Sequence, residues 1–356
     1  MLNRENKSEL LYSRLRERLE RMNEGEIFPS VRQIMQEFRV SRFTVDPVLR
    51  KLRSQGHLEV VVGSGMFVRH PVAGPRPRLL ILEPDWESPS IREMSSLLER
   101  QAAERNFEPE VRVVNHREDF CRILPELSDG VIVANSLVRG LLTPEQVHRL
   151  VHFPTPCILC LNAARVERIC FVTGHNFAAG MMAANYFFRC RRRRMGILRT
   201  EPHGVASDDL IEGFRLAAGS FGCPVNVFDC GTNFGEDSCE RTRDYLARNF
   251  DRVRRCDALL VGSAMTALAS REFLESHGIS VPEECAVLAL GDAKIAEAER
   301  LSVVSAARFD IANEIVEMAA DILQRRFERN FQLEIPPRLI ERGSVKPIKA
   351  EILPIV

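Results

Sequence analysis

The sequence predicts a small N-terminal unit of three helices and a β-hairpin, followed by a larger α/β part with two lobes built on parallel sheets. Three observations predict this fold class: helical apolar spacing and then a hairpin within the first seventy residues, a proline-rich segment after them, and short apolar strands that alternate with helices over the rest of the chain. A chain of 356 residues also exceeds the size at which one hydrophobic core usually keeps growing, so several compact units are expected.

Two helices are expected before residue 40. The first covers roughly Ser8 to Met22 and places Leu11, Leu15 and Leu19 on one face. The second is the run "SVRQIMQEF", which begins after Pro29 with Ser30 as its first residue. Both patterns have the spacing of helices that cover a small core.

The third expected helix lies in the stretch "VSRFTVDPVLRKLRSQG" and contains a proline. Ser41 is placed to cap it by accepting hydrogen bonds from early backbone amides. Pro47 shares a helix face with Phe43 and Arg50, opposite the apolar face of the helix. Its ring removes the amide that would bond Phe43, at a cost of ~3 kcal/mol in a regular helix, so we expect a kink there. The alternative is that Asp46-Pro47 start the regular helix. The apolar face consists of Val45, Val48, Leu49 and Leu52.

A hairpin and a linker end this unit. The run "HLEVVVGSGMFVRH" contains two β-rich segments joined by Gly63-Ser64-Gly65. Helix, helix, helix and hairpin in this order are the pattern of a winged helix-turn-helix, an α+β unit. The segment "RHPVAGPRPR" then places three prolines within ten residues, which predicts a semi-extended linker. We therefore expect one domain over residues 1–70 and a linker over residues 71–77.

Strands alternate with helices over the rest of the chain. Apolar runs such as "RLLILEP", "GVIVAN", "PCILCLN" and "DALLVGS" alternate with helical stretches, among them one about Ile91–Arg105 and a last one about Ala312–Arg329. Short apolar strands without strict alternation are buried on both faces, which predicts parallel sheets with helices on both sides. We expect two such lobes over residues 78–346 and a C-terminal tail over residues 347–356.

Charge and cysteine usage narrow the functional classes. Residues 1–70 contain 13 Lys+Arg and 9 Asp+Glu, a net charge of +4, whereas the remainder contains 36 and 40, a net charge of −4, so the first unit is the one expected to meet a polyanion. No apolar run approaches the ~20 residues of a membrane helix. The start of the chain has no apolar signal-peptide centre, so we expect a cytoplasmic protein with reduced cysteines. Cys157-x-x-Cys160 falls in an expected buried strand, and we expect no metal site and no cofactor.

Three sequence features resemble a known DNA-binding family. They are a Pro-Ser-x-Arg start to the second helix, a Val-Ser-Arg-x-Thr-Val start to the third, and a Gly-x-Gly wing tip followed by Phe-Val. Through them, residues 8–69 resemble the GntR-type winged-helix DNA-binding domain. Through "GHNFAAGMMAANYFF", "IEGFRLAAGSFG" and "HGISVPEECAVLALGD", residues 78–346 resemble the LacI-type effector domain, which is similar to periplasmic sugar-binding proteins. The resemblance implies a winged helix-turn-helix followed by a two-lobed periplasmic-binding-protein-like domain with crossovers near residues 174, 305 and 332, as in AraR-like repressors.

Candidate DNA contacts lie around the third helix. Arg42 and Phe43 lie in its first turn, the part of a recognition helix that enters a major groove, and Arg42 suits guanine. The resemblance assigns the same role to Arg32, Arg42 and Thr44. The basic run "RCRRRR", Arg189 and Arg191–Arg194, is expected to be a solvated turn, with an anion or DNA-backbone contact as the alternative. The expected DNA-binding set is Ser30, Arg32, Ser41, Arg42, Phe43, Thr44, Arg50, Ser64 and Gly65.

Candidate effector contacts lie at the ends of strands in the two lobes. Three positions depart from the pattern of the resembling family: Leu210 stands where an arginine is usual, Ser263-Ala264 where Asn-Asp is usual, and His175 where an aspartate is usual. Because these changes remove polar sugar contacts, we expect a ligand that is less polar or differently charged than a free sugar. Trp86 could stack on a ligand ring or simply pack at the lobe surface. The expected effector-binding set is Trp86, His175, Asn176, Ser263 and Asp292.

These features favour a transcription regulator, expected to act as a repressor, that binds double-stranded operator DNA as a homodimer. A small molecule, a carbohydrate or a derivative, is expected to modulate its DNA affinity. The alternative is a constitutive DNA-binding dimer whose sensor domain has lost its ligand. The sequence contains no Gly-x-Ser-x-Gly elbow, phosphate loop or cluster of metal-ligand residues, so we do not expect an enzyme or a membrane partner.

Overall fold

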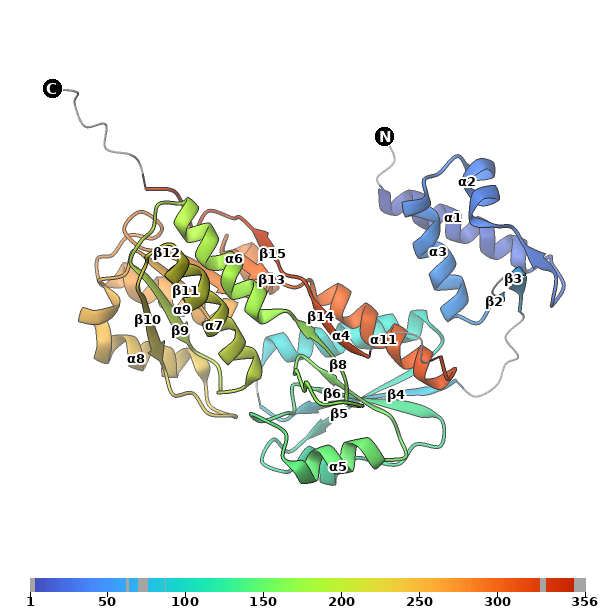
Figure 1. Ribbon diagram of the computed structural model, residues 1–356, viewed down its shortest axis with the longest axis horizontal. Coiled ribbons are helices and arrows are strands. Elements are labelled where there is room, and N and C mark those ends of the chain that lie inside the picture. Colours follow the sequence, from blue (N-terminus) through green and yellow to red (C-terminus); the bar gives the residue numbers. More distant parts are fainter. Residues whose placement is uncertain (1–3, 62–63, 70–75, 87, 327–330, 349–356) are drawn as a thin grey trace.

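The computed structural model describes residues 4–61, 64–69, 76–86, 88–326 and 331–348, which form a small N-terminal domain and a larger two-lobed domain (Figure 1). Most of the expected linker and most of the expected C-terminal tail lie outside the described residues, and so does Gly63 of the wing tip.

The N-terminal domain packs three helices against a small antiparallel sheet. Its helices are α1 (Arg4–Leu19), α2 (Val31–Phe38) and α3 (Arg42–Ser54). Its sheet has the order β1-β3-β2, with β1 (Ile27–Phe28), β2 (Leu58–Val61) and β3 (Gly65–Val68). The helix faces predicted from the apolar spacing, including Leu15, Val45 and Leu52, pack together in the core of this domain. The expected α+β winged arrangement is therefore confirmed.

The α3 helix is continuous from Arg42 through Pro47 to Ser54, with Ser41 as its N-cap residue. The alternative in which Asp46-Pro47 begin the helix is therefore wrong. The helix also runs without a break across Pro47, where a kink was expected.

The two N-caps of this domain differ. In α2, Ser30 accepts a hydrogen bond from the amide of Gln33, and the Gln33 side chain accepts one from the amide of Ser30. In α3, the Ser41 side chain accepts no backbone hydrogen bond, contrary to expectation. Its Oγ lies 3.1 Å from Oγ1 of Thr44, the residue at the position that Gln33 occupies in α2. A neighbouring hydroxyl thus takes the place of the amide.

Two six-stranded sheets organise the rest of the described chain. The N-terminal lobe has the order β14-β8-β7-β6-β4-β5, and the C-terminal lobe has the order β10-β9-β11-β12-β13-β15. All neighbouring strands in these sheets are parallel except β15, which pairs antiparallel with β13. The strands of the first sheet are β4 (Arg78–Pro84), β5 (Glu108–Val114), β6 (Gly130–Asn135), β7 (Cys157–Cys160), β8 (Cys170–Gly174) and β14 (Gln332–Ile335); those of the second are β9 (Met195–Arg199), β10 (Val225–Asp229), β11 (Ala258–Val261), β12 (Ala286–Leu290), β13 (Ser302–Ser305) and β15 (Arg338–Ile340).

Helices cover both sheets, as the sequence predicted (Figure 1). The chain crosses between the sheets after Gly174, Ser305 and Ile335. The last long helix starts at Arg308 rather than about Ala312. The N-terminal lobe contains α4 (Pro89–Glu104), the short 3₁₀ helix η1 (Phe120–Arg122), α5 (Pro144–His152) and α11 (Arg308–Leu323); the C-terminal lobe contains α6 (Asn176–Arg189), α7 (Val205–Ser220), α8 (Ser238–Val253), α9 (Ala264–Ser276) and α10 (Lys294–Ala298).

The basic run before β9 is only partly a solvated turn. Arg192 is 1% exposed, and its guanidinium donates to five backbone carbonyl oxygens. Its neighbours Arg191, Arg193 and Arg194 are exposed. The expectation of a solvated turn is therefore wrong for Arg192, because five carbonyls replace the water that a guanidinium needs. These carbonyls belong to Asp257, Pro282, Glu283, Glu284 and Lys346.

The cysteines behave as packing residues. Cys157 and Cys160 lie in β7, and burial raises the pKa of both thiols above the ordinary value. Over the described residues, no group of His, Cys, Asp and Glu side chains is arranged to hold a metal ion. Within the same part of the chain, every helix is too short or too polar to cross a membrane.

Candidate functional site

One face of α3 is polar and exposed, while the other is buried in the domain core. Arg42, Phe43 and Arg50 are exposed, and Phe43 is 78% exposed although it is a large apolar residue. The Arg42 guanidinium lies 3.2 Å from the Asp46 carboxylate one turn later, which holds it along the exposed face. An exposed aromatic side chain beside an arginine in the first turn of a helix is suited to contact with another molecule.

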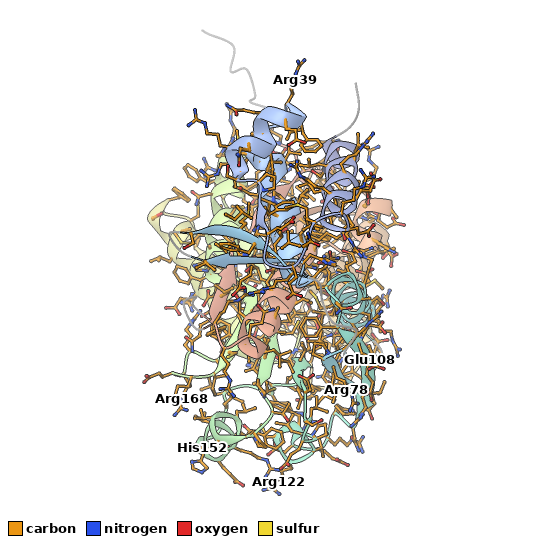
Figure 2. All side chains as sticks on the ribbon, turned by 90° about the vertical axis from the view of Figure 1, so that its right-hand side faces the viewer. Arg39, Arg78, Glu108, Arg122, His152 and Arg168 are labelled. Atoms are coloured by element: carbon orange, nitrogen blue, oxygen red, sulfur yellow. The ribbon has the colours of Figure 1, made fainter. Side chains whose placement is uncertain are left out.

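Two further elements lie beside this face. Arg39, the left-handed residue that ends α2, lies at the outer end of the N-terminal domain, far from Arg122 and His152 at the opposite end of the molecule (Figure 2). Ser64 and Gly65 of the wing tip are exposed. Gly65 has a φ of 120°, which favours glycine, and no heavy atom lies within 4 Å of the position that a Cβ would take.

The expected DNA contacts are not equally available. Ser30 and Arg32 are exposed at the start of α2, although Ser30 is already engaged as its cap. Thr44 is only 8% exposed, and its hydroxyl faces Ser41. Ser41 itself is exposed. Thr44 is therefore placed to shape the first turn of α3 rather than to reach a partner.

A cavity of about 1080 Å³ lies between the two lobes, at the carboxyl ends of their parallel strands. This is where a doubly wound sheet forms its ligand crevice. Of the expected effector residues, Trp86, His175, Asn176 and Ser263 line it. The structure does not bring Asp292 to the wall: its carboxylate lies 2.8 Å from the Arg342 guanidinium, and the preceding Gly291 lines the cavity instead.

The three positions that depart from the family pattern have structural roles here. Leu210 is 3% exposed and contributes an apolar part of the wall. Ser263 is the N-cap of α9, and Ala264 is buried behind it. His175 is the N-cap of α6, with its Nδ1 3.4 Å from the amide of Ala178, and so it turns the chain where it crosses between the lobes. The expected loss of polar sugar contacts at these positions stays a prediction.

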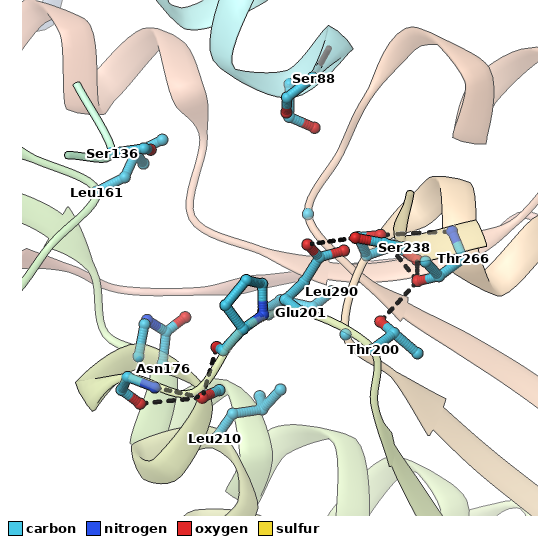
Figure 3. A pocket seen from close by; sticks show the side chains of 18 of the residues that line it. Ser88, Ser136, Leu161, Asn176, Thr200, Glu201, Leu210, Ser238, Thr266 and Leu290 are labelled. Carbon is cyan, nitrogen blue, oxygen red and sulfur yellow. Dashed lines mark hydrogen bonds between the residues drawn. The ribbon is translucent and has the colours of Figure 1, made fainter. Parts of the chain in front are cut away.

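The floor of the cavity is a chain of hydroxyl groups that ends at a carboxylate (Figure 3). Thr200 Oγ1 lies 2.8 Å from Thr266 Oγ1, which lies 2.8 Å from Ser263 Oγ. Glu201, two residues after β9, accepts a hydrogen bond from Ser238 Oγ at 3.2 Å. Burial raises the pKa of Glu201 above its ordinary value, although hydrogen bonds from Ser263 and Ser238 act in the opposite direction.

Aromatic side chains from the two lobes meet at the mouth of the cavity. Trp86 follows β4 in the N-terminal lobe, and its ring lies 5.5 Å from that of Phe234, in the loop between β10 and α8 of the other lobe. His116 packs edge-on against Trp86, with ring centroids 5.4 Å apart, and pairs with Asp85. The neighbouring Gly235 has a φ of 85°, which favours glycine, and a Cβ there would lie 2.5 Å from the end of the His116 ring.

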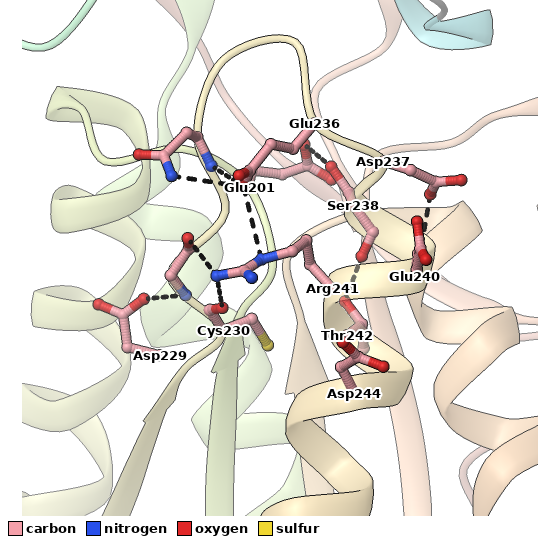
Figure 4. Close-up of polar contacts among 12 residues, drawn as sticks. Glu201, Asp229, Cys230, Glu236, Asp237, Ser238, Glu240, Arg241, Thr242 and Asp244 are labelled. Carbon is pink, nitrogen blue, oxygen red and sulfur yellow. Dashed lines mark hydrogen bonds and ion pairs between the residues drawn. The ribbon is translucent and has the colours of Figure 1, made fainter.

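The loop that carries Phe234 is held from the α8 side (Figure 4). The Arg241 guanidinium donates to the carbonyl oxygens of Cys230 and Gly231, and it lies 3.4 Å from the carboxylate of Glu236. One arginine thus ties both ends of the loop and positions Phe234 at the mouth.

Polar bridges also join the lobes away from the mouth. Arg165 pairs with Asp209 of α7, with its Nη2 2.9 Å from Glu334 of β14. Gly140 and Gly204 form a backbone bridge between the lobes. Arg308 pairs with Glu93 of α4, and its Nη1 lies 3.4 Å from the carbonyl oxygen of Asp292. The lobes therefore stand in a closed arrangement around the cavity.

Both domains of the chain match known protein families. A model of the bacterial regulatory proteins of the gntR family matches residues 7–68, and a model of the periplasmic binding protein-like domain matches residues 184–345. The chain joins a GntR family domain to a periplasmic binding protein-like domain. It is a transcription regulator and not an enzyme, as the sequence predicted.

Individual relatives match large parts of this chain. The arabinose metabolism transcriptional repressor of Geobacillus stearothermophilus is 23% identical over 92% of this chain and 93% of its own. The crystal structure of a LacI transcriptional regulator from a Rhodococcus species has a TM-score of 0.64 at 14% identity, over 76% of this chain and 99% of its own. The complex of the transcriptional regulator CelR with cellobiose has a TM-score of 0.61 at 20% identity, over 86% of this chain and 92% of its own. The expected two-lobed fold is confirmed.

Several residues of this regulator that sequence reasoning did not single out stand at its candidate sites. Glu201, Phe234 and Arg308 line the cavity, His116 packs against Trp86, and Arg39 lies at the outer end of the N-terminal domain. Glu201 comes two residues after a predicted apolar strand, and that position alone signals the ligand edge of a parallel sheet. The other residues meet only through tertiary contacts, for which the sequence contains no local signal.

Proposed function

We propose that this regulator binds operator DNA as a homodimer in the cytoplasm and represses transcription, with its DNA affinity set by a small carbohydrate-like molecule in the interlobe cavity. The observation that carries the proposal is a cavity with walls from both lobes, in the same chain as the exposed face of the candidate recognition helix α3. A ligand that contacts both lobes favours the closed arrangement, and only such differential binding can shift a conformational equilibrium.

The DNA-binding part rests on the exposed face of α3. Arg42, with the exposed Phe43 and Arg50, offers a cation and an apolar ring to a major groove, and the wing tip offers backbone to a phosphate. Two weak readers linked in a dimer would read a near-palindromic operator with a higher affinity than either alone. Ser30 and Arg32 at the start of α2 would contact the phosphates beside them.

The effector part rests on the polar and aromatic lining of the cavity. A volume of about 1080 Å³ accommodates a mono- or disaccharide. The transcriptional regulator CelR, a structural neighbour of this chain, was solved as a complex with cellobiose. Trp86 would stack on a sugar ring from the mouth, while Asn176 and Ser263 contribute polar groups.

Fluorescence anisotropy with labelled genomic fragments, followed by sedimentation with and without DNA, tests the proposal. A specific fragment should bind two chains, and a carbohydrate panel should contain a member that changes the affinity at least several-fold. Specific DNA binding that no small molecule alters would instead support the ligand-free dimer. A single chain on the DNA would contradict the dimer.

A further inference from the structure

At the floor of the cavity, the acidic side chain of Glu201 has no basic partner among the described residues. Glu201 lies between the lobes, and its carboxylate points toward open space with Ser88 on the opposite wall (Figure 3). Its hydrogen-bond partners are hydroxyl groups, from Ser238 and Ser263. Among the described residues it forms no ion pair, so a partly buried carboxylate lacks a compensating cation.

The arginines that face the inner cavity are, in contrast, neutralised by acids. Arg199 pairs with Asp208 at 2.7 Å, and Arg308 pairs with Glu93. Arg243 lies 3.4 Å from Glu272. Their charges are already satisfied, so these three arginines would give an anionic ligand no free cation to offset its repulsion by Glu201. Arg92, on the first turn of α4, also lines the cavity and is exposed.

A carboxylate has about four lone-pair sites, and two hydroxyl donors leave capacity for a strong donor from a ligand. An ammonium group supplies three donors and the missing positive charge. Beside Glu201, the partly exposed Ser263 hydroxyl can give and take hydrogen bonds with a polyol, while the buried Thr200 and Thr266 hydroxyls hold it in place. Trp86 and Phe234 at the mouth provide ring faces, which attract cations as well as sugar rings.

We propose that the cavity selects an amine-bearing carbohydrate, with the ammonium group against Glu201 and a ring hydroxyl against Ser263. This inference rests on the proposed function, because it names the ligand class of the same cavity. It makes Glu201 the residue that sets specificity by charge.

Calorimetric titration of the full chain at neutral pH tests the inference. The panel contains D-glucosamine and D-galactosamine, the matched neutral sugars D-glucose and D-galactose, N-acetyl-D-glucosamine, and the anionic D-galacturonate and D-glucose 6-phosphate. An amino sugar should bind, and its neutral and acetylated counterparts should bind about 10- to 100-fold more weakly, as expected for the loss of a hydrogen bond between charged groups. The anionic sugars should not bind measurably.

The matched variants are Glu201→Gln and Glu212→Gln. Glu201→Gln keeps the shape of the side chain and removes its charge, so the preference for the amino sugar over the neutral sugar should disappear. Glu212→Gln makes the same change at an exposed position of α7 away from the cavity, and this variant should keep the preference for the amino sugar. Circular dichroism of both variants confirms that each is folded.

The outcomes separate this inference from the proposed function. A neutral or anionic sugar that binds more tightly than its amine and alters DNA affinity would overturn the inference and leave the proposed function standing. An amino sugar bound through Glu201 without any effect on DNA affinity would support the inference and remove the regulatory proposal. Unchanged amine affinity in Glu201→Gln, or no binding by any member of the panel, would overturn the inference.

Discussion

Gln55, which follows α3, donates a hydrogen bond from Nε2 to the backbone carbonyl oxygen of Glu104 at 2.6 Å. Glu104 is the last residue of α4, and the first turn of the same helix lines the interlobe cavity at Ser90 and Arg92. The Gln55 side chain also accepts a hydrogen bond from the Tyr12 hydroxyl at 2.7 Å. One side chain thus connects the N-terminal domain to a helix that begins at the cavity.

Gln55→Ala should weaken the effect of the ligand on DNA binding while leaving DNA affinity without ligand nearly unchanged. The variant loses a contact worth about 1 kcal/mol, roughly a fivefold change in coupling. The measurement is the ratio of DNA dissociation constants with and without ligand. Gln324→Ala, at the end of α11, serves as the control. An unchanged ratio in Gln55→Ala would show that coupling passes elsewhere.

Arg42→Ala should lower the affinity for a specific DNA fragment by about 1–3 kcal/mol, because the variant loses a guanidinium suited to a guanine edge. Arg42 is exposed and outside the domain core, so the fold should persist. Anisotropy titration measures the effect, with Arg100→Ala on the exposed face of α4 as the control. Equal affinities of wild type and Arg42→Ala would remove Arg42 from the interface.

Pro47→Ala should raise the free energy of unfolding by up to about 3 kcal/mol, because alanine restores an amide inside the continuous helix α3. The same change should alter operator preference, since Pro47 is exposed on the side of Phe43. Denaturant unfolding and a selection from random DNA sites measure the two effects. A less stable variant would mean that proline acts mainly by stiffening the unfolded chain.

Local spacing predicted much of the fold, and its failures have physical causes. The α3 apolar face was predictable because Val45 and Leu52 repeat at helical intervals. The strand β10 was missed because it lies at a sheet edge, where "VNVFD" alternates instead of being wholly apolar. The strand β8 follows β7 with no helix between them, so it breaks the alternation on which the prediction relied.

The cavity was less predictable than the fold. Trp86 and Ser263 could be placed there because they follow predicted strands. Asp292 also follows a strand, yet Arg342, fifty residues later in the chain, draws its carboxylate away from the wall. Partners that meet across such a distance or across two lobes leave no local pattern in the sequence.

Glu201→Gln should raise the melting temperature at neutral pH and have little effect in acid. Burial raises the pKa of Glu201 in the folded protein, so folding favours the protonated form. Below the ordinary carboxyl pKa the group is protonated in both states. As pH rises from the ordinary pKa to the raised pKa, the unfolded state loses its proton first and stability falls; above the raised pKa the loss is complete. Melting curves over this range check the sign. A variant that is less stable at neutral pH would show that the carboxylate stabilises the fold.

Arg192→Lys should destabilise the C-terminal lobe by about 3 kcal/mol or more, because an ammonium cannot reach five carbonyl oxygens from one position. The carbonyl oxygens left without a donor would remain buried without a hydrogen bond. Urea unfolding measures the loss. Arg194→Lys, in the same basic run but exposed, should change stability by less than about 0.5 kcal/mol. Similar values for both variants would contradict the special role of Arg192.

The proline inside α3 also changes what the helix backbone can offer. Because Pro47 has no N–H, the carbonyl oxygen of Phe43 lacks the donor that residue i+4 supplies in a regular helix. That oxygen lies one residue after Arg42, beside an exposed ring. A major groove presents donors as well as acceptors, the cytosine and adenine amino groups among them. The main chain of α3 therefore presents this carbonyl oxygen without its regular helical donor, and only a substitution at Pro47 would restore that donor.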